Sequence, residues 1–239
     1  MSMFARIDEI DMDDEGSWKG RIFLTLDMDW AADFVLADAI DLLTGVPATW
    51  FVTHSTPLLD RLRAEPGAEL GIHPNFNPLL FTASAAGDVN QVLDGLQRLV
   101  PEAVSVRSHS LVHGTGILAE CERRGFRYDC NLLIPWSTGM ALRPWRHWEP
   151  GMLRVPHCWE DDVACMYGWP FDAGNDYWYR PDGLNVIDLH PIHLYLNTES
   201  LARYEQSRPV HRDPALLASW RHQGHGARSF LMALLEKYR

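Results

Sequence analysis

The stretch RIFLTLDMDWAADFVLADAIDLL, residues 21–43, decides the fold class. An apolar run ends in Asp27 and Asp29, and a helical spacing of apolar residues begins directly after them. A strand followed at once by a helix is the repeating unit of a parallel sheet. Carboxylates at the end of a buried strand are costly to remove from water unless a cation meets them, so the two aspartates predict a cation nearby.

The same alternation of strand and helix continues along the chain. Further strands are expected at 47–54, 68–73, 103–107, 126–131, 151–156 and 184–190, and helices at 30–43, 56–65, 88–100, 115–124, 214–220 and 227–238. Between the last three strands, the proline-, tryptophan- and glycine-rich sequence is expected to form long loops. Repeated βα units predict one α/β domain over residues 1–239, with a parallel sheet that is either open or closed into a barrel.

Composition limits the classes of function. The 239 residues are 46% hydrophobic and 22% charged, as is ordinary for a globular protein. A formal net charge of -11 argues against nucleic acid or an anionic membrane surface as the main partner. The sequence shows no signal-peptide pattern and no long apolar run, so a soluble cytoplasmic protein without a membrane span is expected. The four cysteines lack CxxC spacing and are expected to be reduced thiols. The oligomeric state stays open.

Most of the expected strands end in side chains that can bind a metal or carry a proton. These are Asp27, Asp29, His54, His73, Arg107, His109, Asn131, His157 and His190. Because the C-terminal ends of the strands in βα folds face one mouth, we expect several of these side chains to converge there. Carboxylate and imidazole are the ligands of zinc and similar ions. The sequence therefore predicts one divalent metal ion, with zinc as the first choice.

The order of these motifs resembles the polysaccharide deacetylase family, also called carbohydrate esterase family 4 or NodB-homology proteins. The matching segments are TLDMD, GIHPNFN, VRSHS, RVPHCWEDD and VIDLHP, within residues 21–195. The resemblance implies a distorted (β/α)7-type barrel with its active site at the C-terminal ends of the strands. It also implies metal-dependent hydrolysis that removes an acyl group, N-acetyl above all, from a sugar or sugar precursor of polysaccharide biosynthesis.

The first two motifs imply the base and the metal ligands. By resemblance, Asp27 is the general base and Asp29 a metal ligand, and residues two apart on an extended chain point the same way. His73 matches the first histidine of the family's H-x3-H pair, but Asn77 stands where the second should be. An amide oxygen is a weaker zinc ligand than imidazole, so His109 or a water could complete the site instead.

The other three motifs imply the remaining roles. Arg107 would orient Asp27, and His190 would be the general acid, with His193 as the fallback. Residues Trp159, Asp161 and Asp162 are the nearest matches to the motif that lines the substrate groove. Six tryptophans fall between residues 136 and 178. They could stack on sugar rings or pack the loops onto the barrel, and the sequence leaves both open.

Three other functions compete with a deacetylase. FLTLDMDW also resembles the first motif of haloacid-dehalogenase-type phosphatases, in which Asp27 and Asp29 would act on phosphate. The only lysines, however, are Lys19 and Lys237, at the chain extremes, where the lysine that such enzymes need is not expected. A D-x-D pair also occurs in glycosyltransferases that bind nucleotide sugars through a metal. Finally, Asn77 could mark a metal-free carbohydrate-binding pseudoenzyme.

Overall fold

The apolar run of the opening stretch forms the central strand of the sheet. In the computed structural model, which describes residues 3–81, 88–149 and 151–239, β2 (Ile22–Asp27) is buried along its whole length. It pairs in parallel with β3 (Ala48–Val52) and with β10 (Asn185–Leu189). The short β1 (Phe4–Ala5) pairs with its first residues. A parallel strand buried on both faces is apolar throughout, which explains the run that ends at Asp27.

The sheet is parallel at every pairing but one. Its strands lie in the order β7-β8-β6-β5-β4-β3-β2-β10-β9, with β1 beside β2. The remaining bounds are β4 (Ala68–Ile72), β5 (Ser105–Val106), β6 (Tyr128–Asp129), β7 (Trp145–Arg146), β8 (Leu153–Arg154) and β9 (Trp159–Glu160). Only β7 and β8 pair antiparallel among the strands of the described residues.

The two ends of the curled sheet meet in one segment, residues 153–160. At its start, the backbone N–H of Val155 donates to the carbonyl of Asp129, just after β6, at 2.8 Å. Near its end, the N–H of Cys158 donates to the carbonyl of Val186 in β10 at 2.9 Å. This segment carries both β8 and β9, so it bridges the sheet between β6 and β10. The expected distorted barrel of parallel strands is confirmed.

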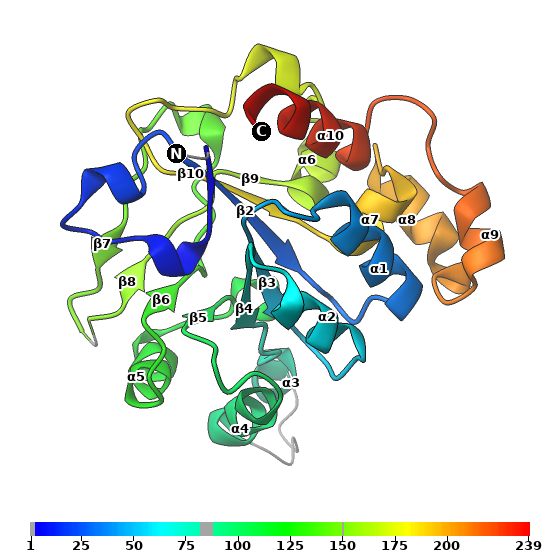
Figure 1. The fold of residues 1–239 in the computed structure, drawn as a ribbon. Helices are drawn as coiled ribbons and strands as arrows, with labels where there is room; N and C mark the ends of the chain where they lie inside the picture. The colour runs from blue at the N-terminus through cyan, green and yellow to red at the C-terminus, as the bar shows by residue number, and fades with distance from the viewer. Residues whose placement is uncertain (1–2, 82–87, 150) are drawn as a thin grey trace.

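Helices surround the sheet, as Figure 1 shows from α10 at the top through α7 and α1 to α4 and α5 at the bottom. Their bounds are α1 (Asp33–Leu42), α2 (Leu58–Ala64), α3 (Asn77–Phe81), α4 (Val89–Leu99), α5 (Thr115–Arg123), α6 (Asp161–Tyr167), α7 (Pro191–Leu196), α8 (Leu201–Ser207), α9 (Pro214–Ser219) and α10 (Ala227–Tyr238). Short 3-10 turns are η1 (Ile7–Glu9), η2 (Glu15–Ser17), η3 (His109–Leu111), η4 (Trp136–Thr138), η5 (Ala173–Asn175) and η6 (Arg208–Val210). The sequence did not predict α3, α6, α7 or α8.

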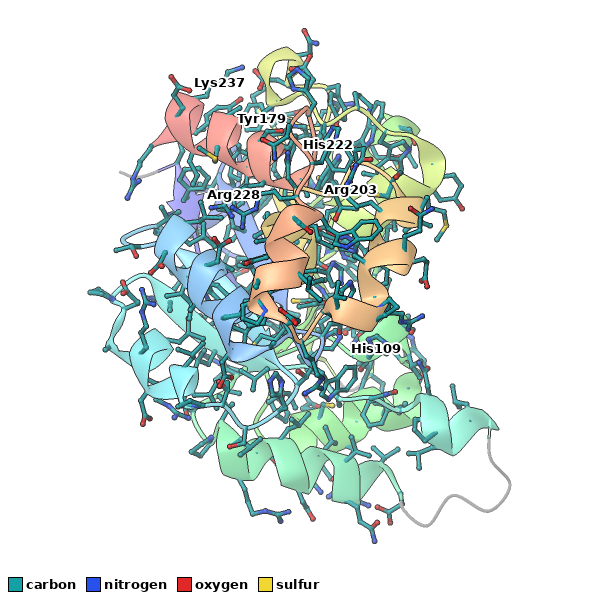
Figure 2. The ribbon with its side chains drawn as sticks, turned by 90° about the vertical axis from the view of Figure 1, so that its right-hand side faces the viewer. His109, Tyr179, Arg203, His222, Arg228 and Lys237 are labelled. Atoms are coloured by element: carbon teal, nitrogen blue, oxygen red, sulfur yellow. The ribbon has the colours of Figure 1, made fainter. Side chains whose placement is uncertain are left out.

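The C-terminal helix α10 packs against both the loop-rich region and the barrel. Phe230 of α10 stacks on Trp159 with ring centroids 4.4 Å apart. In Figure 2, Arg228 and Lys237 lie on α10, where Arg228 pairs with Asp38 of α1. Lys237 pairs with Asp176 of the loop region at 2.6 Å. No helix within the described ranges is long and apolar enough to span a membrane.

Candidate active site

His73, at the end of β4, lies between the two aspartates of the opening stretch. Its Nδ1 is 3.4 Å from Oδ2 of Asp27, and its Nε2 is 3.2 Å from Oδ1 of Asp29. The chain leaves the strand after Asp27, and Asp29 has a left-handed φ of 40°. The two carboxylates therefore do not follow one extended chain as expected. The turn brings both of them to the same imidazole instead.

Asp29, His73 and His109 form one of the groups of side chains that could hold a divalent cation. Their ligand atoms all lie within 4.8 Å of one another, and His109 Nδ1 is 3.1 Å from Oδ1 of Asp29. Burial opposes the charged form of Asp29, but the hydrogen bond with His109 and the close imidazole of His73 outweigh it and lower the pKa of the Asp29 carboxyl. Both ring nitrogens of His73 are buried without a hydrogen bond of normal geometry. Two imidazoles and a carboxylate are a zinc-type donor set, so these residues fit such an ion.

Asn77 stands apart from this group. It begins α3, and its side-chain NH2 donates to the hydroxyl of Ser110 at 3.1 Å. Among the described residues, no hydrogen bond or ion pair joins it to Asp29 or His73. His109 is the third member of the group, and its role as a metal ligand stays a prediction.

Arg107, directly after β5, is a fully buried cation that bonds two aspartates, Asp27 and Asp188. Its Nη1 donates to Oδ1 of Asp27 at 3.1 Å and also bonds Asp188 of β10. Burial opposes the charge, but the carboxylates of Asp188 and Asp27 outweigh it and raise the pKa of Arg107 further. Arg107 therefore holds both carboxylates in fixed positions. The sequence analysis missed Asp188, although it lies two residues before His190 as Asp27 lies two before Asp29.

His190 is held by Asp161, the first residue of α6. One oxygen of Asp161 is 2.7 Å from Nδ1 of His190, and the other accepts the backbone N–H of His190 at 2.8 Å. Burial disfavours a charged imidazole here, but the charge of Asp161 outweighs burial and raises the pKa of His190. Its Nε2 is 3.8 Å from Oδ2 of Asp29, so His190 reaches the same group from β10.

Two of the three residues expected to line the substrate groove have no exposed surface. Trp159 and Asp161 are both 0% exposed, and Trp159 donates from Nε1 to the hydroxyl of Tyr177 at 3.0 Å. A side chain without exposed surface cannot touch a substrate. Trp159 packs the loops, and Asp161 orients His190. Asp162 does line the cleft.

The active-site cleft has a volume of about 620 Å³, and Asp29, His109 and His190 form part of its lining. Figure 2 shows His109 close to the orange helices that follow α7. Trp30 also lines the cleft and is 40% exposed. None of the six tryptophans between residues 136 and 178 appears in this lining. The sequence analysis missed Trp30 because an aromatic residue after a strand reads equally well as core.

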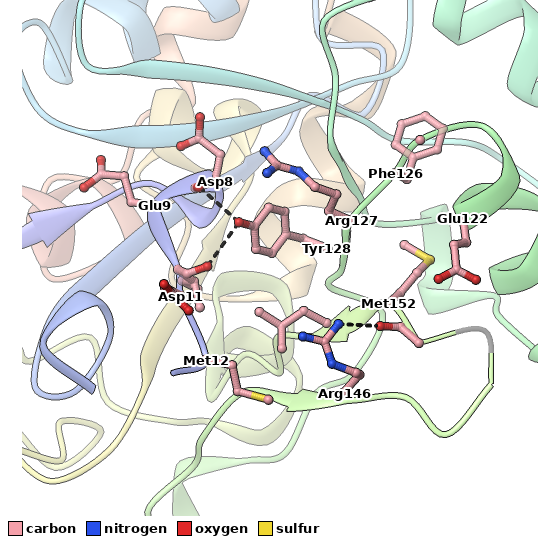
Figure 3. A pocket seen from close by; sticks show the side chains of 14 residues that line it. Asp8, Glu9, Asp11, Met12, Glu122, Phe126, Arg127, Tyr128, Arg146 and Met152 are labelled. Atoms are coloured by element: carbon pink, nitrogen blue, oxygen red, sulfur yellow. Dashed lines mark hydrogen bonds between the residues drawn. The ribbon is translucent and has the colours of Figure 1, made fainter. Parts of the chain in front are cut away.

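A second hollow, of about 540 Å³, lies at the opposite end of the strands (Figure 3). There the hydroxyl of Tyr128, the first residue of β6, donates to the backbone carbonyls of Asp8 and Ile10, both at 3.1 Å. Catalytic groups of βα folds gather at the other, C-terminal end of the strands. We therefore take the cleft of Asp29 and His190 as the candidate active site.

The fold and this cleft define a class: a parallel, barrel-like α/β protein with carboxylates and imidazoles at the C-terminal mouth. The chain belongs to the family described as WbmS-like polysaccharide deacetylase, whose model matches residues 24–208. The family expected from the motifs is thus confirmed. It favours deacetylase chemistry over the phosphatase and glycosyltransferase alternatives.

A solved structure agrees with this assignment. The chain is 59% identical to a Bordetella bronchiseptica protein assigned as a polysaccharide deacetylase involved in O-antigen biosynthesis, with a TM-score of 0.96 over 99% of this chain and 98% of that one. A Mycobacterium smegmatis protein assigned as a polysaccharide deacetylase is 17% identical, with a TM-score of 0.46 over 97% of this chain and 93% of that one, and supports no inference at this distance. Comparison with curated proteins finds no match.

Proposed function

We propose that this protein removes an acyl group, N-acetyl first among the candidates, from a sugar or sugar precursor used in polysaccharide biosynthesis. The observation that carries the proposal is that Asp27 and Asp29 meet at the buried imidazole of His73, while His109 and His190 lie 3.1 and 3.8 Å from Asp29. The family match supports the deacetylase class, and the donor set supports a divalent ion.

Asp29, His73 and His109 would hold that ion. When bound, a zinc or similar ion lowers the pKa of a water and polarises the acyl carbonyl. The abundance of carboxylates at this mouth suits a cation, since Asp27, Asp188, Asp161 and Asp162 all come from neighbouring strand ends.

Asp27 is the proposed general base. Arg107 binds its Oδ1, which fixes the plane of the carboxylate, and Oδ2 faces the imidazole of His73. A carboxylate held in this way can take a proton from an attacking water without first losing rotational freedom. Arg107 acts through Asp27 and is a positioning residue.

His190 is the proposed general acid. Because Asp161 binds Nδ1 and raises the pKa of the imidazole, the proton available for transfer sits on Nε2, which faces the cleft group. From there it can be given to the departing nitrogen of the sugar. His193, the fallback acid, is buried, and burial lowers the pKa of its imidazole, so it suits this role less well.

The test is acyl release from N-acetylated sugars, with zinc, manganese or cobalt supplied, by the wild type and by Asp27→Asn. We expect Asp27→Asn to keep its metal and to lose about 10²- to 10⁴-fold in kcat, the usual contribution of a general base. Asp60→Asn, on the exposed face of α2, is the matched control and should leave kcat unchanged. Substantial activity in Asp27→Asn would mean that the base has been assigned wrongly.

A further inference from the structure

Arg212 lies in the lining of the active-site cleft without a partner. The structure gives it no hydrogen bond or ion pair with any residue of the described ranges. The other arginine of the lining, Arg208, is bound to Glu205 at 3.1 Å. In a chain with a net charge of -11, this leaves an uncompensated guanidinium in the cleft that also holds Asp29 and His190.

Trp30 lines the cleft together with both Arg212 and members of the candidate metal group. It lines the cleft together with Asp29, and it lines an adjoining hollow of about 320 Å³ together with Arg212. The edge of its ring contacts His109, with centroids 5.2 Å apart. Trp30 therefore contacts the candidate metal group and shares the lining of both hollows with Arg212.

The backbone holds Trp30 in this place. Its φ of 54° lies in the left-handed region, which is unusual for a bulky residue, and its N–H donates to the buried hydroxyl of Thr53 at 3.0 Å. Strained backbone persists only where the surroundings fix it, and it gathers at functional sites. The result is a rigid, partly exposed apolar face on the wall of the cleft.

The lining also contains a row of rings. His193, Tyr204 and His211 follow one another with centroids 5.0 and 5.1 Å apart, and His190 continues the row at 5.6 Å from His193. All four line the cleft. A sugar ring bound in this cleft can contact Trp30 and this row of rings, and both the reaction centre and Arg212 lie in the same lining.

We infer that the substrate is an acylated sugar that carries an anionic group, phosphate or carboxylate, with its ring against Trp30 and the anion on Arg212. The inference rests on the proposed function for the place of the acyl group. A planar guanidinium matches the two oxygens of a phosphate or carboxylate, and such charge-assisted bonds are the strong ones. A neutral sugar would give the guanidinium of Arg212 no anionic partner.

The test measures dissociation constants calorimetrically for three probes: methyl N-acetylglucosaminide, N-acetylglucosamine 1-phosphate and N-acetylgalactosaminuronic acid. Wild-type protein should bind at least one anionic probe about tenfold more tightly than the neutral one, and the preferred probe identifies the anion. In Arg212→Gln this preference should fall to nearly nothing. Trp30→Ala should weaken all three probes alike and keep the preference. Arg61→Gln, on α2 away from the cleft, should change neither.

Two results would overturn the inference. Equal binding of neutral and anionic probes by the wild type would show that the cleft does not select charge. A preference that survives in Arg212→Gln would place the anion elsewhere, for instance on a bound metal ion, and the same titration of chelator-treated protein identifies that case.

Because these are binding measurements, the proposed function is tested separately. Anion preference without acyl release under any metal would refute the proposed function alone, and acyl release without preference would refute this inference alone.

Discussion

Glu69 of β4 is a buried carboxyl that the proposed reaction does not use. Replacing it tests how burial inside the barrel changes the ionisation of a carboxyl and the stability of the fold. It accepts hydrogen bonds from the hydroxyls of Thr49 and Ser105, both at 2.6 Å, and from the backbone N–H of Asp8 at 3.0 Å. Burial, together with the charge of Asp8, raises the pKa of Glu69 from 4.5 to about 7. The folded protein therefore binds a proton here that the unfolded chain releases near pH 4.5.

The sign of the pH dependence follows from this. The pKa of Glu69 is higher in the folded protein than in the unfolded chain. Its contribution to the free energy of unfolding is therefore fully present below pH 4.5 and is lost as the pH rises through about 7. At about 1.4 kcal/mol for each pKa unit, ionising Glu69 costs the folded state about 3 kcal/mol at pH 8. Glu69→Gln keeps the shape of the side chain and cannot ionise, so the variant should lose this part of the pH dependence.

Urea unfolding at several pH values between 4 and 8 measures the effect. We expect Glu69→Gln to be more stable than the wild type at pH 8, by up to about 3 kcal/mol, and no more stable at pH 4. Glu236→Gln, on the exposed side of α10, should follow the wild type at every pH. If the difference between Glu69→Gln and the wild type is the same at pH 4 and pH 8, Glu69 does not titrate as described.

Three further predictions concern the site. Asp161→Asn should lower kcat about tenfold or more with metal content unchanged. The alkaline limb of its pH profile of kcat should move to lower pH, because His190 loses the neighbouring charge that raises its pKa. Asn77→Ala should leave zinc affinity unchanged in a competition titration, and a weaker affinity would make Asn77 a ligand. Arg107→Ala should lower the free energy of unfolding by about 3–5 kcal/mol, measured in urea, because the buried carboxylates around it lose their cation.

The fold could be predicted largely because its strands are buried on both faces and therefore mostly apolar. The run before Asp27 and the runs that became β3, β4 and β10 stand out from the sequence for that reason. The helix α7 could not be seen in the same way. All six of its residues are buried, so it lacks the polar stripe that marks a helix at the surface.

The site was predictable where it follows the strand ends. Asp29, His73 and Arg107 lie where the βα pattern places them. Asp188 and Arg212 were missed for physical reasons. Asp188 lies inside an apolar strand, where nothing local shows that it faces a buried arginine, and Arg212 reaches the cleft from a loop after η6 that no motif marks.

The most direct test of the central claim is elemental analysis of the purified, tag-free protein beside Asp29→Ala, without chelator. The account predicts one zinc or similar divalent ion per chain in the wild type and none in Asp29→Ala. Absence of metal from the wild type, even after soaking in zinc, manganese and cobalt, would contradict it. The cleft would then be that of a metal-free carbohydrate-binding protein.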